Sequence, residues 1–338
     1  MLEEGTHKLM EQNEIFKVAQ QYLRDVPLML IGTGGTIPYG IPGMKELAEY
    51  LINSLGEKYK ADPQWDTFSS NINSGQDLES ALTNISLRKE ILEDIIRQTW
   101  VLVNESDLRL FYEILESKTV LPIAKLIKKL LEPHPQCVNI ITTNYDRVIE
   151  YGCDQIKINV DKRFVGHYIK YFSNTKLQKS KVVNLIKVHG SLDLFKDEND
   201  YVYSIPLQKD IPINLIPEII TPGEDKYKTI LNGECRDLVH IADDLINDAK
   251  SYLCIGYGFN DKQIQRNIIA GIKQDKPIVV VTRKISDESA GLIINNSKNY
   301  IIIQEDHENI ENTDIIVNGN RVTLEGTYWT VEGLLKII

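Results

Sequence analysis

The stretch Leu28–Pro42, which reads Leu-Met-Leu-Ile-Gly-Thr-Gly-Gly-Thr-Ile-Pro-Tyr-Gly-Ile-Pro, constrains the fold of this chain more than any other. Four apolar residues typical of a buried strand lead into a loop with four glycines, and a helical pattern begins near Met44. Glycine allows a sharp turn and close approach of a ligand, and backbone N–H groups of such a turn can hold phosphates. The stretch therefore predicts a nucleotide-binding loop between a strand and a helix. A tight turn without a ligand is the alternative.

Short apolar runs recur along the chain, and helical patterns separate most of them. Several runs are nearly continuous in Val and Ile, as expected for parallel strands that are covered on both faces. This alternation predicts an α/β fold with a doubly wound, Rossmann-like parallel sheet. The expected strands are Leu28–Ile31, Val138–Thr142, Val182–Val188, Tyr252–Ile255, Ile278–Thr282 and Tyr300–Ile303.

Two inserts interrupt the predicted Rossmann domain, which spans residues 26–305. Residues 46–133 carry apolar residues at helical spacing, so a large helical insert that rests on the sheet is expected there. Within it, Pro63–Trp65 and Ser74–Asp77 are predicted turns. Residues 194–233 contain four prolines and predict a loop-rich insert with short strands.

The two ends of the chain predict smaller units. Residues 1–25 are polar and predict an N-terminal helical arm. Residues 306–338 predict a small C-terminal hairpin and helix, because Asn318-Gly319 separates two apolar runs and is a strong turn signal.

Composition and cysteine spacing narrow the function classes. A net charge of −10 argues against direct nucleic-acid binding. No apolar run is long enough to span a membrane and no leader opens the chain, so a cytoplasmic protein without a membrane partner is expected. The four cysteines form no Cys-x-x-Cys pair, and no pair of histidines and acids has metal-ligand spacing. Neither a disulfide framework nor a metal site is therefore predicted.

Four predicted strand ends carry polar or glycine-rich residues. In doubly wound sheets, ligands bind beyond the carboxyl ends of the strands, so we expect the four ends to meet at one cleft. They are Gly32–Gly35, Thr142–Asp146, Val188–Ser191 and Gly256–Asp261. The first loop lacks the third glycine of the dehydrogenase fingerprint at the required offset, which disfavours hydride transfer.

The candidate reactive side chains within these loops are Asn144, Asp146 and His189. Asn144 and Asp146 alternate at a strand end, where either can face the cleft, and the alternative for Asp146 is a cap of the following helix. His189 also follows a strand, where a histidine is a natural general base near neutral pH. The alternative for His189 is a histidine that only hydrogen-bonds a loop.

Taken together, the four loops resemble those of the sirtuin family. The family's motifs read Gly-Ala-Gly-x-Ser-x-x-x-Gly-Ile-Pro, Thr-Gln-Asn-Ile-Asp, His-Gly and Gly-Thr-Ser, in this order. Thr33 and Thr36 are close substitutes in the first motif, and Gly256-Tyr257-Gly258 approximates the last. The residues that match in register are Gly32, Gly34, Gly40, Ile41 and Pro42, then Thr142, Asn144 and Asp146, and then His189 and Gly190.

Three departures separate this chain from the deacylases of that family. After Gly-Ile-Pro the deacylases continue Asp-Phe-Arg, whereas this chain reads Gly43-Met44-Lys45. The four zinc cysteines are missing, and a long insert separates the first two strands. The combination resembles the sirtuin-like branch of bacterial anti-phage defence, whose members hydrolyse NAD to nicotinamide and ADP-ribose. Within that branch, the chain is similar to the stand-alone type that acts with a partner such as a HerA-type hexameric ATPase.

The resemblance implies that NAD is the substrate and that water is the acceptor, since the phenylalanine that screens water in deacylases is missing. It implies that His189 is the base, that Asn144 holds ribose hydroxyls or the attacking water, and that Asp146 binds the nicotinamide carboxamide. The remaining implied NAD contacts are Gly32, Thr33, Gly34 and Thr36 around the pyrophosphate, Pro42 in the same loop, and Gly256, Gly258 and Thr282 along the adenosine half.

Two other functions remain open from the sequence. An NAD-dependent protein deacylase is disfavoured by the missing zinc module. A non-catalytic subunit of an ATPase complex that senses NAD or ADP-ribose is the alternative from another class. A nuclease has no supporting cluster of metal-binding acids. A homo-oligomer is expected, because apolar-faced helices of an insert often pack against a neighbouring subunit.

Overall fold

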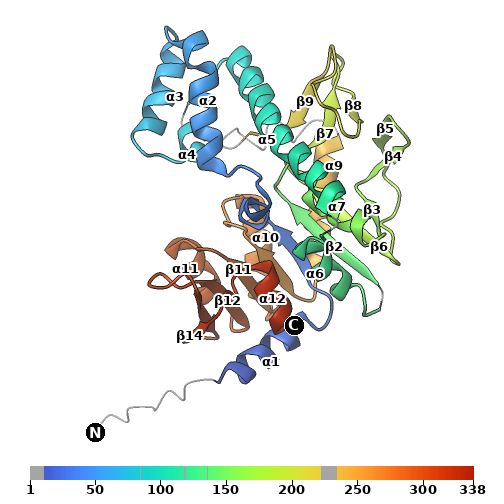
Figure 1. Cartoon of the computed structure of the whole chain (residues 1–338), viewed down its shortest axis with the longest axis vertical. Helices are drawn as coiled ribbons and strands as arrows, with labels where there is room; N and C mark the ends of the chain where they lie inside the picture. Colours follow the sequence, from blue (N-terminus) through green and yellow to red (C-terminus); the bar gives the residue numbers. More distant parts are fainter. Residues whose placement is uncertain (1–10, 84, 118, 135, 222–233) are drawn as a thin grey trace.

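The core of the molecule is one large, mostly parallel sheet (Figure 1). The structure is a computed structural model that describes residues 11–83, 85–117, 119–134, 136–221 and 234–338. Neighbouring strands run parallel except at the end of the sheet formed by the last two strands of the chain. In spatial order the strands are β14 (Asn320–Glu325), β13 (Asn312–Val317), β12 (Tyr300–Glu305), β11 (Ile278–Thr282), β10 (Tyr252–Ile255), β1 (Leu28–Ile31), β2 (Cys137–Thr142), β6 (Val182–Lys187) and β3 (Asn159–Asp161).

Helices cover both faces of this sheet, which confirms the predicted doubly wound α/β fold. Alternate residues of each strand point to opposite faces, so Met29 and Ile31 enter one apolar core and Leu28 and Leu30 the other. The six predicted strands are all present with nearly the predicted bounds. The first face is covered by α1 (Gln12–Leu23), α6 (Pro122–Leu130), α7 (Val148–Gln155) and α12 (Val331–Ile337), and the second by α9 (Glu234–Asp248), α10 (Lys262–Ile272) and α11 (Asp287–Asn296).

The predicted helical insert is helical but does not rest on the sheet as a whole. Its helices are α2 (Met44–Tyr59), α3 (Pro63–Asn73), α4 (Leu78–Thr83), α5 (Lys89–Ser117) and α6. Helices α2, α3 and α4 share a separate core with the start of α5, where Trp65, Phe68 and Ile95 are buried. The later part of α5, including Trp100, joins the core on the sheet. In Figure 1 the long α5 accordingly links the outlying helices to the body of the molecule.

The predicted turn at Pro63–Trp65 is wrong, because these residues form the first turn of α3. The carboxylate of Asp62 accepts hydrogen bonds from the N–H groups of Gln64 and Trp65 and caps the helix. Proline is favoured at the first helical position, where its missing N–H costs nothing. Gly75, by contrast, lies in the predicted second turn with a φ of +92°.

The predicted loop-rich insert belongs to a second, antiparallel sheet that begins earlier in the chain. Short strands occur after residue 194 as expected, but the sheet also includes two segments from residue 164 onward, which at three residues each are too short to be recognised in the sequence. Residues 222–233 of this insert, and residues 1–10 of the predicted arm, lie outside the described residues. The strand order is β4 (Phe164–Gly166), β5 (Lys170–Phe172), β8 (Val202–Ser204), β7 (Gly190–Lys196) and β9 (Ile216–Ile219).

The C-terminal hairpin forms as predicted, with Asn318 and Gly319 both in the left-handed region that a tight hairpin turn requires. Strand β13 pairs with β12, so the hairpin extends the main sheet. The division of the chain into residues 1–25, 26–305 and 306–338 stays a prediction. Among the helices of the described residues, none combines the length and apolar character needed to cross a membrane.

The strand order places a crevice beside β1. The chain leaves β1 toward β2 on one side of the sheet, whereas it leaves β10 toward β11 on the other side. At such a reversal the loops after the two strands diverge and open a crevice beyond their carboxyl ends. The fold thus positions a site between the loops that follow Ile31 and Ile255.

Candidate functional site

A pocket of about 290 Å³ lies at this crevice, and all four predicted loops contribute to its wall. Its volume is near the lower end of the range for small-molecule sites. The predicted convergence of the four loops on one cleft is therefore observed. The lining residues are Gly32, Thr33, Met44, Asp77, Glu79, Thr143, Tyr145, His189, Gly256, Tyr257, Gly258, Asn260 and Asp261.

The glycines of the first and fourth loops pack against each other, backbone to backbone. A Cβ atom on Gly32 would lie 2.5 Å from the carbonyl oxygen of Gly256, and a Cβ atom on Gly256 would lie 2.0 Å from the nitrogen of Gly35. Gly256 also has a φ of +53°, which favours glycine. Contact between the two loops thus accounts for glycine at these positions, which neither a ligand contact nor a tight turn within one loop had predicted.

The N–H groups of the first loop are largely used within the protein. Gly32 donates to the carbonyl oxygen of Ile255 and Gly34 to that of Gly256, each at 3.1 Å. The N–H groups of Gly35 and Thr36 close a short 3₁₀ helix, η1 (Thr33–Gly35). The expectation that this turn offers its N–H groups to phosphates is therefore not met by these four groups in this conformation.

Asn144 braces the first loop from behind the pocket. Its Nδ2 donates to the carbonyl oxygen of Gly32 and to Oγ1 of Thr36, each at 3.0 Å. Its neighbours Thr143 and Tyr145 line the pocket, whereas Asn144 itself does not. The Oδ1 atom of Asn144 is buried and has no hydrogen-bond partner among the described residues. A buried amide oxygen without a partner is an acceptor site for a donor from outside the chain.

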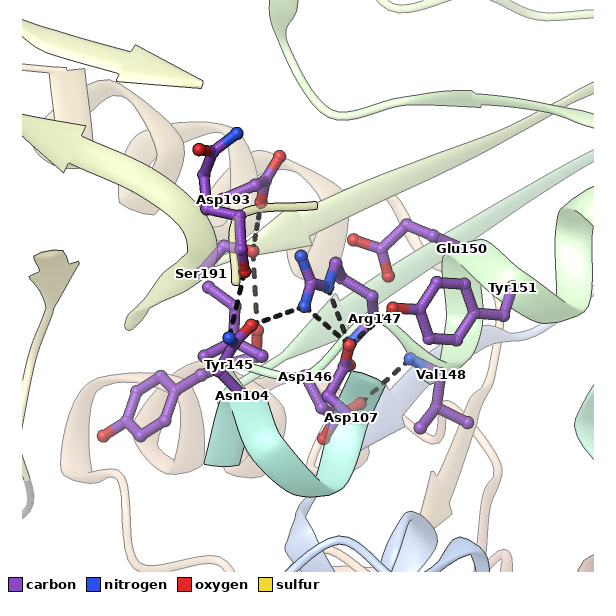
Figure 2. Close-up of polar contacts among 12 residues, drawn as sticks. Asn104, Asp107, Tyr145, Asp146, Arg147, Val148, Glu150, Tyr151, Ser191 and Asp193 are labelled. Carbon is purple, nitrogen blue, oxygen red and sulfur yellow. Dashed lines mark hydrogen bonds and ion pairs between the residues drawn. The ribbon is translucent and has the colours of Figure 1, made fainter. Parts of the chain in front are cut away.

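Asp146 also lies behind the pocket, beside the first residue of α7. Its Oδ1 accepts a hydrogen bond of 3.2 Å from the N–H of Val148, which Figure 2 shows beside a buried cluster of polar side chains. Burial raises the pKa of the Asp146 carboxyl to about 6, although the Lys187 ammonium opposes the shift. The structure therefore places Asp146 just before Arg147, the N-cap of α7, and not among the residues that line the pocket.

The raised pKa of Asp146 predicts a stabilising substitution. The unfolded carboxyl titrates near 3.8 and the folded one near 6, so the folded state binds the proton more tightly. Stability therefore falls as the pH rises from about 4 to about 6, and the cost persists above pH 6. Asp146→Asn removes this cost and keeps an oxygen for the N–H of Val148. At about 1.4 kcal/mol per pKa unit, we expect a gain on the order of 3 kcal/mol at pH 7.

Urea unfolding of the wild type and of Asp146→Asn at pH 4 and pH 7 measures this gain. The difference in free energy of unfolding should be much smaller at pH 4, where the folded carboxyl is protonated and the unfolded one is close to its titration midpoint. An equal difference at the two pH values would show that the charge of Asp146 is not its source.

An ion pair beside Asp146 ties the second loop to α5, as Figure 2 shows. Arg147 donates through Nε to Oδ2 of Asp107 at 2.8 Å, and its backbone N–H donates to Oδ1 of Asp107 at 2.6 Å. Asn104 accepts from the guanidinium at 2.7 Å, and Tyr151 donates to the same carboxylate at 2.5 Å. Both members of the pair are buried. The helical insert thereby holds the backbone of the residue that follows Asp146.

His189 occupies the turn between β6 and β7 and faces Asp261. Its Nε2 lies 2.8 Å from Oδ2 of Asp261, and the side chains of both residues are about nine-tenths buried. Gly190 makes the turn possible, since its φ is +83° and a Cβ atom would lie 2.0 Å from the carbonyl oxygen of Glu218. Asp261 was not predicted as a site residue. An aspartate directly before a helical pattern is a helix-start signal that marks it in the sequence.

Besides Asp146, four predicted NAD contacts lie outside the pocket wall. Thr36 is buried and accepts from Asn144, and Oγ1 of Thr282 donates to the carbonyl oxygen of Lys284 at 3.4 Å. Pro42 is half-buried just before α2. The other predicted contacts, Gly32, Thr33, Gly256 and Gly258, line the pocket. Gly34 follows Thr33 in the first loop but does not line the pocket.

The helical insert contributes lining residues that sequence reasoning missed. Met44 begins α2, while Asp77 and Glu79 lie at the start of α4. Asp77, Glu79 and Asp261 are all acidic, so the charged part of the pocket wall consists of these carboxylates and His189. Met44 stands where deacylases carry the phenylalanine named above. Within the described residues, no cluster of three or more His, Cys, Asp and Glu side chains could hold a metal ion.

Comparison with known proteins gives one family match and several similar structures. The family model for the SIR2-like domain matches residues 138–315. No curated protein matches the chain. Similar solved structures include Sir2Tm bound to a propionylated peptide, with 13% identity, a TM-score of 0.44, and coverage of 84% of this chain and 91% of that chain. Another is Sir2 with a p53 peptide and NAD+, with 15% identity, a TM-score of 0.41, and coverage of 86% and 92%.

Proposed function

Because this chain belongs to the SIR2-like domain family, we propose that it is an NAD glycohydrolase, which releases nicotinamide and ADP-ribose. Family membership is consistent with an enzyme that uses NAD. The observation that supports hydrolysis is the pocket itself, where His189 and the glycine loops meet an acidic wall. No zinc module or second substrate groove is required for this reaction, since water is the acceptor.

The reaction breaks the bond between the ribose C1′ and N1 of nicotinamide. The electron pair of that bond goes to N1 and neutralises the pyridinium, while positive charge develops on the ribose. The carboxylates of Asp77 and Glu79 line the pocket and stabilise such a charge by electrostatic attraction. Water then bonds to C1′, and His189 takes the proton that the water gives up.

The substrate contacts follow from the lining residues. The pyrophosphate is assigned to the side of Gly32 and Thr33, where the Thr33 hydroxyl is a donor, and the adenosine half to Gly256 and Gly258. Asn144 lies behind the pocket wall, and its buried, unpartnered Oδ1 is proposed to accept from a ribose hydroxyl or from the attacking water on binding. Gly34, Thr36, Pro42 and Thr282 are proposed to act from outside the pocket wall, and the carboxamide contact of Asp146 stays a proposal beside its hydrogen bond from Val148.

Replacing Asn144 or His189 by alanine should abolish nicotinamide release. General-base catalysis contributes about 10²- to 10⁴-fold to such reactions, so His189→Ala should lose at least that factor. Chromatographic measurement of nicotinamide and ADP-ribose at saturating NAD gives the rate. His167→Ala is the matched control, because His167 is exposed on the β4–β5 hairpin. Near-normal turnover in Asn144→Ala or His189→Ala would remove the assignment of that residue.

We further propose that the protein is an NAD-depleting effector of bacterial anti-phage defence. It acts as a homo-oligomer in the cytoplasm, with a HerA-type hexameric ATPase as its partner. Incubation with NAD, alone and with the protein encoded by the neighbouring gene, tests both points. Tight NAD binding without NAD loss in either mixture would favour an NAD-sensing subunit instead. Nicotinamide release that requires an acylated peptide would favour a deacylase.

A further inference from the structure

The carboxylate of Asp261 divides its two oxygens between a helix and a histidine. Oδ1 accepts hydrogen bonds from the N–H groups of Gln263 and Ile264, each at 3.0 Å, and so caps α10. Oδ2 faces Nε2 of His189 at 2.8 Å. The helix therefore fixes the orientation of the carboxylate, and the carboxylate in turn fixes the imidazole ring.

This contact decides which ring nitrogen of His189 carries the hydrogen. An ionised carboxylate only accepts hydrogen bonds, so the neutral imidazole must present N–H at Nε2. The lone pair then lies on Nδ1, which becomes the ring atom that can take a proton. A hydrogen bond to one ring nitrogen sets the state of the other in this way.

We propose that Asp261 is a positioning residue that holds His189 in the Nε2–H tautomer and leaves Nδ1 as the proton acceptor. The assignment rests on the proposed role of His189 in NAD hydrolysis. It adds a residue that the loop motifs did not identify and gives that residue a different task from the carboxylates of the insert. Asp77 and Glu79 face the pocket from outside the sheet, whereas Asp261 acts through His189.

Asp261→Asn tests the proposal with little change in shape. The amide oxygen of asparagine can still accept from the N–H groups of Gln263 and Ile264, which turns the amide NH₂ toward His189. Because the NH₂ group only donates, Nε2 must then accept, and the ring hydrogen moves to Nδ1. The nitrogen that should take the proton is thereby blocked. We expect a loss of NAD turnover on the order of 10³- to 10⁴-fold with the fold retained.

Asp62→Asn is the matched control for the capping role. Asp62 caps α3 through N–H groups two and three residues later, as Asp261 caps α10, and its other oxygen pairs with Arg88. The control should keep full NAD turnover. In a His189→Ala background, Asp261→Asn should cause no further loss, because the two residues act as one unit. A further loss of tenfold or more in that background would overturn the proposal.

NMR spectroscopy determines the tautomer of His189 without an activity assay. Long-range ¹H–¹⁵N spectra of protein with ¹⁵N-labelled histidine report the hydrogen on each ring nitrogen, and His189→Gln identifies the signals of His189. The expected result is Nε2–H in the wild type and in Asp62→Asn, and Nδ1–H in Asp261→Asn. An unchanged tautomer in Asp261→Asn would overturn the proposal. If the wild type releases no nicotinamide, the proposed function fails, and the tautomer still decides the role of Asp261.

Discussion

Gly256→Ala is expected to lower the free energy of unfolding by about 3–5 kcal/mol and to disrupt the pocket. The new Cβ atom would lie 2.0 Å from the nitrogen of Gly35 and 2.1 Å from the carbonyl carbon of Gly34. Both are backbone atoms of η1, which cannot withdraw without breaking the hydrogen bond from Gly34 to Gly256. Left-handed backbone costs a residue with a Cβ about 1–2 kcal/mol, and overpacking adds about 1–3 kcal/mol or more.

Gly258→Ala is the matched control, since it lies two residues later in the same loop. A Cβ atom there would meet the side chain of Asn260 at 3.6 Å, which is ordinary contact. We expect a change within about 0.5 kcal/mol, as for most exposed substitutions. Denaturant unfolding followed by circular dichroism measures both variants. Equal stability of Gly256→Ala and Gly258→Ala would contradict the close packing of the two loops.

The parts of the fold that depend on local pattern could be predicted from the sequence. Runs of Val and Ile such as Ile278–Thr282 mark strands that are buried on both faces, and the glycine loop after Ile31 marks the crevice. The reason for the glycines was only partly accessible. Gly32 and Gly256 are 224 positions apart in the numbering, and nothing in either segment reveals that their backbones touch. A close approach to a ligand and a close approach to another loop demand the same residue.

The parts of the site that depend on distant contacts could not be predicted. Asp77 and Glu79 reach the pocket because α2, α3 and α4 form a separate core beside the sheet, which the helical periodicity of each segment does not specify. Asp146 is equally suited in the sequence to a ligand contact and to a helix cap, and only the folded chain shows that its carboxylate accepts from the N–H of Val148 while Arg147 takes the N-cap position. Local motifs thus identified the loops, while tertiary packing assigned the tasks of their side chains.

Asp107→Asn is expected to cost about 3–5 kcal/mol, because it leaves the buried guanidinium of Arg147 without its counter-charge. The side chain of Asp107 is fully buried, and that of Arg147 is 5% exposed. The substitution keeps the shape of the side chain but replaces one accepting oxygen by a donor. Arg147 then meets a donor at that position, and the hydroxyl of Tyr151 loses the same acceptor. The loss should appear as a lower denaturation midpoint with an unchanged slope.

The ion pair also predicts how a second substitution behaves. Arg147→Met alone leaves the Asp107 carboxylate buried and unpaired, so it should cost a similar amount, whereas Asp107→Leu with Arg147→Met removes both charges and should recover a large part of the loss. Glu105→Ala is the control on the same helix, because Glu105 is exposed. Additive losses in the double variant would contradict a coupled pair. If the double variant recovers stability but not NAD turnover, the pair serves function by positioning the loop that contains Asn144. The backbone N–H of Arg147, just after that loop, donates to the carboxylate of Asp107.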